Sequence, residues 1–113
     1  MEIEIRNRGQ VKLLKLTGRL TLGEAVDRLR AAFDDLAGTG ANCYVVDLAD
    51  IAMLDSSGIG LLVQCLTSSK KRGGSLKLVN PSPFARKTLT MIGLLKLFEV
   101  FDEQESAIAS FGQ

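Results

Sequence analysis

Apolar and polar positions follow two different periods along this chain, and the order of these periods predicts the fold. Ile3 and Ile5 alternate with charged residues, which is typical of a β-strand. A polar turn at residues 7–10 separates them from a second apolar run, so we expect a hairpin. From about Thr21 to Ala37 the apolar residues recur at helical spacing. The stripe of this expected helix comprises Leu22, Val26, Leu29, Phe33 and Leu36.

The rest of the chain alternates further strands and helices. We expect strands at 43–48, 75–80 and 97–101, and helices that begin after residue 55, near residue 84 and after residue 102. Gly93 should end the third helix, and Asp102 with Glu105 fits a capping box for the last one. This order predicts one α/β domain over residues 1–113, in which a mixed sheet of about five strands is covered by about four helices.

The segment Asp55-Ser56-Ser57-Gly58 joins an apolar strand to a helix. The start of a helix carries unpaired N–H groups and a partial positive charge, so it accommodates an anion such as a phosphoryl group. In sheets of this kind, ligands and partners meet the loops at the carboxyl ends of strands, where this segment lies. Asp and Ser are also common N-caps. Local chemistry therefore leaves two interpretations, a phosphorylatable switch and a simple helix start.

Composition narrows the classes of function. The chain has no histidine, so it lacks a Ser-His-Asp triad, and residues 58–60 lack the Gly-Lys-Ser/Thr that completes a P-loop. We therefore expect a binding protein, not an enzyme, with no cofactor or metal of its own. Cys43 and Cys65 stand far apart in apolar segments, where we expect buried thiols.

Charge and hydropathy bear on partners and location. The net charge of +1 argues against a general nucleic-acid coat. No apolar run reaches the roughly 20 residues that span a bilayer, so we expect no membrane span. Charged residues alternate with apolar ones at the N-terminus, which is unlike a secretory signal. We therefore expect a cytoplasmic protein.

Several segments resemble the STAS domains of bacterial anti-sigma factor antagonists, nearly from end to end. The specific signal is the strand at 45–48 followed by the segment 53–60 and its spacing to Gly73-Gly74, and weaker likeness occurs at 16–20, 76–80 and 93–98. The resemblance implies that Ser56, directly after the aspartate, takes the phosphoryl group, with Ser57 as the alternative. It also implies a partner-binding surface made of Asp47, Met53, Asp55, Ser56, Ser57, Gly58 and Thr21. Many family members have an acidic residue where this chain has Thr21, a position that bears on partner choice.

The resemblance further implies a partner-switching cycle. The unmodified protein would bind an anti-sigma factor that is also a serine kinase, and would thereby release a sigma factor. Phosphorylation would reverse binding because it adds roughly −1.5 to −2 charges to an interface, beside the charges of Asp55 and Asp47. A separate metal-dependent serine phosphatase would restore the protein. The alternative is a constitutive adaptor subunit of a signalling or lipid-transport assembly, with the serines serving as caps.

Overall fold

A computed structural model describes residues 1–111 of the chain. Within these residues the strands form one five-stranded sheet in the order β1-β2-β3-β4-β5. β1 is antiparallel to β2, and the remaining neighbours are parallel. The structure thus confirms the expected α/β fold with a mixed sheet. The elements are β1 (Glu2–Arg8), β2 (Val11–Leu20), α1 (Glu24–Gly38), β3 (Cys43–Leu54), α2 (Ser56–Lys71), β4 (Ser75–Val79), α3 (Pro83–Met91), the 3-10 helix η1 (Leu95–Leu97), β5 (Val100–Phe101) and α4 (Gln104–Ala109).

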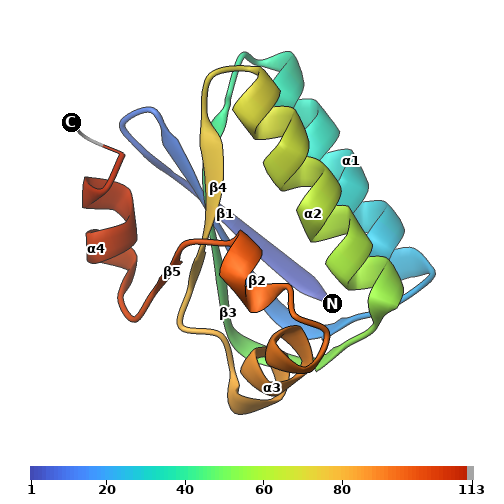
Figure 1. Cartoon of the computed structure of the whole chain (residues 1–113). Coiled ribbons are helices and arrows are strands. Elements are labelled where there is room, and N and C mark those ends of the chain that lie inside the picture. The colour runs from blue at the N-terminus through green and yellow to red at the C-terminus, as the bar shows by residue number, and fades with distance from the viewer. Residues whose placement is uncertain (112–113) are drawn as a thin grey trace.

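One face of the sheet is covered by α1 and α2, which lie side by side, with α3 near one end (Figure 1). Strand residues that alternate toward this face are fully buried, Leu14 and Leu16 in β2 among them. Leu29 of α1, Leu62 of α2 and Leu89 of α3 pack into the same apolar cluster. Burial of this apolar surface is the main favourable term in folding, so this face supplies most of the core.

Among the elements of residues 1–111, α4 alone covers the opposite face (Figure 1). Its apolar cluster is small and includes Leu13 and Val45 from the strands and Ala107 from α4. Two charged side chains are also buried here, Asp47 on β3 and Lys77 on β4. Buried charges need partners, and both have them, as described below.

The first helix begins three residues later than the pattern predicted. Gly23 has φ 113°, a left-handed conformation that cannot belong to an α-helix, so α1 starts at Glu24. Leu22 therefore lies outside the helix and is 77% exposed, although its spacing had placed it on the buried stripe. The first-turn carboxylates Glu24 and Asp27 then suit the helix dipole.

The strand before the Asp-Ser-Ser-Gly segment is longer than expected. β3 continues six residues beyond Leu48 to Leu54, because β2 pairs with it in parallel as far as Leu20 and Leu54. Two register shifts in β2 interrupt this pairing, between Lys15 and Thr17 and between Gly18 and Arg19. Such irregularities increase the local twist of a strand and mask its two-residue period.

The C-terminal part departs most from the expected elements. The last strand is only Val100–Phe101, and Leu97, where the expected strand began, belongs instead to the 3-10 helix Leu95–Leu97. The predicted capping box is wrong, because Glu103 is the N-cap of α4 and makes no side-chain cap bond. Glu105 instead forms a bidentate ion pair with Arg8 of β1.

The two cysteines are free thiols in the described chain. Cys65 is buried as expected, and burial raises the pKa of its thiol to about 12. Cys43 is only half-buried, which corrects the expectation that both thiols lie in the core. A thiol with so high a pKa is protonated near neutral pH and is a poor nucleophile, so Cys65 acts as a packing residue.

Candidate functional site

Asp55 holds together the two loops of the candidate site. Its carboxylate accepts hydrogen bonds from the backbone N–H of Gly58, at 2.9 Å, and from that of Leu22, at 2.8 Å. The first bond caps α2, and the second ties the β2–α1 loop to the start of that helix. These bonds, the one from Leu22 foremost, hold the pKa of Asp55 below its ordinary value of 3.8. The carboxylate is therefore ionised at neutral pH.

Gly58 allows α2 to approach the end of β2 closely. A Cβ atom added at Gly58 would lie 2.4 Å from the carbonyl oxygen of Leu20, which is far inside van der Waals contact. The backbone N–H of Asp55 also donates to that carbonyl, at 3.4 Å. Gly58 is thus required by packing, and its contribution to the site is to bring Thr21 and Leu22 beside Asp55 and Ser56.

The two serines differ in exposure. Ser56 is the first residue of α2 and is exposed, whereas Ser57 is half-buried. The N-cap of the helix is Asp55, so neither serine has that role. Ser56 is therefore an exposed residue at the positive end of the helix dipole.

The neighbouring residues form a mixed surface around Ser56. Thr21 directly follows Leu20, which is paired with Leu54 in the sheet, so Thr21 and Asp55 leave adjacent strand ends. Met53 is half-buried, and its sulfur accepts a contact from the Arg19 guanidinium at 3.4 Å. Thr21 thus lies beside Asp55 at the ends of adjacent strands, and the Met53 side chain contacts Arg19 of β2.

Leu22 is the site residue that the sequence pattern missed. Its spacing matched a helical stripe, but the left-handed Gly23 excludes it from α1, and its backbone is bound to Asp55. The exposed side chain is thus held beside the start of α2. The Leu-Gly pair just before the acidic first turn was the available signal, because glycine commonly marks a position outside a helix.

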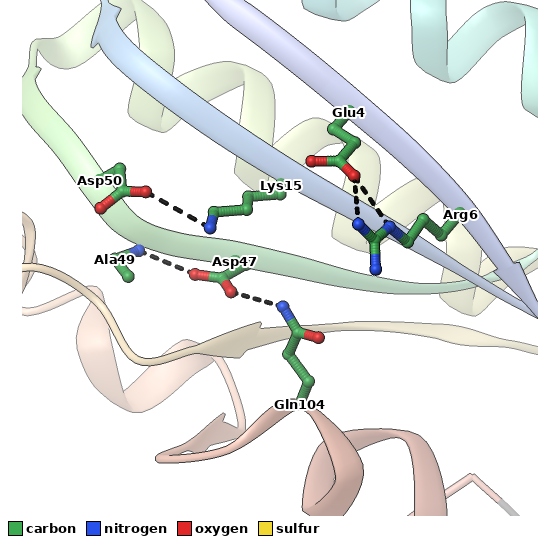
Figure 2. Close-up of polar contacts among 7 residues, drawn as sticks. All are labelled: Glu4, Arg6, Lys15, Asp47, Ala49, Asp50 and Gln104. Carbon is green, nitrogen blue, oxygen red and sulfur yellow. Dashed lines mark hydrogen bonds and ion pairs between the residues drawn. The ribbon is translucent and has the colours of Figure 1, made fainter.

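Asp47 lies apart from the other predicted site residues. It faces α4, and its carboxylate accepts hydrogen bonds from the Gln104 side chain at 2.7 Å and from the Ala49 N–H at 2.9 Å (Figure 2). Asp47 is only 6% exposed, whereas Ser56 starts a helix on the other face of the sheet. The expectation that Asp47 adds its charge to the surface around Ser56 is corrected by this placement.

The described part of the chain, residues 1–111, contains no group of His, Cys, Asp and Glu side chains arranged to hold a metal ion. Within the same residues, none of the helices has the length and apolar character needed to cross a membrane.

Comparison with known proteins identifies the family. The family model of the STAS domain matches residues 2–107. This chain belongs to the STAS domain family. A STAS-domain containing protein of Pseudomonas aeruginosa is 33% identical to it over 92 residues, which cover 81% of this chain and 89% of that protein. The anti-sigma-B factor antagonist of Bacillus subtilis is 32% identical over 80 residues, covering 71% and 72% of the two chains.

Solved structures agree with the fold of this STAS domain. The anti-sigma factor antagonist SpoIIAA in its unphosphorylated form superposes with a TM-score of 0.83 at 25% identity, covering 96% of this chain and 95% of that one. Bacillus SpoIIAA in the phosphorylated form gives a TM-score of 0.77 at 25% identity, covering 96% and 98%. The STAS fold therefore extends over nearly the whole chain.

Proposed function

We propose that this STAS domain is an anti-sigma factor antagonist whose binding surface is switched by phosphorylation of Ser56. The observation that carries the proposal is the position of Ser56, exposed at the first residue of α2, beside the exposed Leu22 that Asp55 holds in place. An apolar side chain next to a hydroxyl suits a protein interface that excludes water. The same surface, once charged, would reject that partner.

A phosphoryl group at Ser56 would change the charge of the binding surface and leave the fold unchanged. At the first position of a helix, an anion interacts favourably with the dipole, so α2 remains intact. The group adds roughly −1.5 to −2 charges beside the ionised Asp55. Burying this charge against a partner is costly, and a loss of about 3 kcal/mol would weaken binding on the order of a hundredfold.

Ser56 is preferred over Ser57 as the modified residue. A protein kinase needs the hydroxyl in solvent, and Ser56 is exposed whereas Ser57 is half-buried. Ser57 offers a kinase less accessible surface than Ser56 does. We keep Thr21, Met53 and Asp55 in the proposed partner surface, and we leave Asp47 out because it is buried under α4.

The proposed partners follow from the family. Relatives of this chain are named as anti-sigma factor antagonists, and SpoIIAA is known in both phosphorylated and unphosphorylated forms. We propose an anti-sigma factor with serine kinase activity as the partner of the unmodified form and a serine phosphatase acting on the modified form. Both belong in the cytoplasm, where ATP is available. The uncharged Thr21 would tune which kinase is bound.

The test compares wild-type protein with Ser56→Ala and Ser56→Asp as baits in native cell extract, with bound proteins identified by mass spectrometry. Wild type and Ser56→Ala should retain a kinase-type protein that Ser56→Asp loses. Ser68→Asp, the same change on an exposed serine far along α2, is the matched control and should retain it. Equal binding by all four baits would overturn the switch and indicate a constitutive adaptor.

A further inference from the structure

The outer edge of the sheet carries a charge pattern that is complementary to itself. β1 has the sequence Glu-Ile-Glu-Ile-Arg-Asn-Arg over residues 2–8. If two such strands lie antiparallel and are centred on Ile5, Glu4 of each copy faces Arg6 of the other, and Glu2 faces Arg8. Opposite charges directly across an antiparallel pair stabilise it.

The edge of β1 is open to such pairing. β1 is the terminal strand of the sheet, and among the described residues it pairs only with β2. Its register with β2 is unbroken over the seven residues, and the strand contains no proline. Bulges, prolines and charged side chains are devices that protect an edge from a second strand. This edge has no bulge or proline, and its charges are complementary to those of a second copy in the antiparallel register. Its outer N–H and C=O groups can therefore accept another strand.

The charged residues of β1 share one face of the sheet. Glu4 is opposite Lys15 in β2, and both lie on the face that carries α4 (Figure 2). Glu4 and Arg6 form an ion pair within the strand at 2.6 Å, with side chains 53% and 68% exposed. Exposed pairs of this kind contribute little, so exchanging the pairing within one copy for pairing between two copies costs little.

Arg8 can pair with Glu2 of a second copy without giving up its present contact with Glu105. Its guanidinium donates two hydrogen bonds to Glu105 of α4. A guanidinium has five N–H donors, so others remain for Glu2 of a second copy.

The apolar face of β1 also favours pairing. Ile5 is opposite Leu14 and lies on the side of α1, yet it is 43% exposed. The two-fold axis places Ile5 of one copy against Ile5 of the other, which would cover both side chains. We propose that β1 pairs antiparallel with β1 of a second copy of this chain, joining two five-stranded sheets into one continuous sheet. This dimer is independent of the state of Ser56.

A charge-exchange experiment tests the proposal. The dissociation constant of purified protein is measured by sedimentation velocity over a range of concentrations. Glu4→Arg and Arg6→Glu each place like charges opposite one another at two positions, so each should weaken the dimer by at least about tenfold. The double variant Glu4→Arg/Arg6→Glu restores both pairs in reversed orientation and should recover the wild-type constant.

The control is Asp102→Arg, which makes the same change of charge as Glu4→Arg but beyond β5, at the opposite edge of the sheet. It should dimerise like wild type. Circular dichroism should show both single variants folded, because the substituted side chains are exposed. A wild type that stays monomeric at millimolar concentration, single variants that dimerise normally, or a double variant that fails to recover would each overturn the proposal.

Discussion

The two faces of the sheet are built by different means. On the face of α1, α2 and α3, neighbouring elements meet through fully buried apolar side chains such as Leu14 and Leu62. On the face of α4, a short helix is held by a small apolar cluster and by polar contacts. One of these is Lys77, which is 7% exposed, donates to the Ser110 hydroxyl at 2.6 Å and lies 4.2 Å from the Phe111 ring centroid. The comparison teaches that the stability of the domain and the docking of α4 depend on separate sets of contacts.

Adjacent leucines of β2 test this difference directly. Leu14 points into the large cluster and Leu13 into the small one. We expect Leu14→Ala to lower the free energy of unfolding by about 4 kcal/mol and Leu13→Ala by about 2 kcal/mol, because the larger core is less able to close the cavity. Urea unfolding measures both. Equal losses would show that the two faces contribute alike.

Two glycines of α2 test how closely the helix packs on its face. Gly58→Ala would press a methyl group against the Leu20 carbonyl, and we expect a loss of about 2 kcal/mol. Gly60 has nothing within 4 Å of an added Cβ, so Gly60→Ala should stabilise the helix by roughly 0.5–1 kcal/mol. Thermal unfolding of the two variants gives the comparison. If Gly58→Ala leaves the free energy of unfolding unchanged, α2 and β2 can move apart without loss of stability.

The polar attachment of α4 can be weakened alone. Lys77→Met removes the hydrogen bond to Ser110 and the ion pair with Glu99. We expect the free energy needed to open α4 locally to fall by about 1 kcal/mol. Hydrogen exchange of the Ala107 and Ser110 amides, which donate to carbonyls of the helix, should then be roughly fivefold faster, while α1 and α2 keep their rates. Lys87→Met, an exposed change on α3, is the control. Faster exchange throughout the chain would contradict the separation of the two faces.

The smallest expected effect concerns the bridge made by Asp55. Its folded-state pKa is lowered, so its stabilising contribution is complete above the unfolded pKa and is lost as the pH falls through the folded pKa. Asp55→Asn should cost roughly 0.5 kcal/mol near neutral pH. The difference from wild type should shrink as the pH falls from about 5 to below 3.8. Urea unfolding across this range measures it, and a difference that grows on acidification would contradict the assignment.

Much of the fold was predictable because it depends on local period. The parallel strands are largely apolar runs buried on both faces, and the two long helices each bury one apolar stripe, so these patterns predicted the strands and helices. The predictions that failed concern segments whose structure depends on contacts with residues distant in the chain. β3 extends to Leu54 because β2 pairs with it, and η1 replaces part of the last strand although Leu97 and Phe98 are apolar.

The candidate site likewise contains residues that the sequence predicted and residues that it placed wrongly. The sequence identified Asp55, Ser56 and Gly58 because strand, cap and helix follow one another directly. The family resemblance gave Asp47 a place in the surface around Ser56, whereas strand alternation turns Asp47 to the other face of the sheet. The sequence pattern assigned Leu22 to a core that the left-handed Gly23 keeps it from reaching.

By itself, the sequence determined the order of elements and most of the apolar faces, since both follow from the spacing of neighbouring residues. The proposal of Ser56 as the phosphoryl acceptor came from the family resemblance. Only the tertiary structure decided that Asp55 bridges two loops, that Gly58 must be glycine and that Lys77 is buried under α4. Each of these contacts joins residues far apart in the chain: Asp55 and Leu22 are 33 positions apart, Gly58 and Leu20 are 38 apart, and Lys77 and Ser110 are 33 apart. Their geometry exists only once the sheet has assembled.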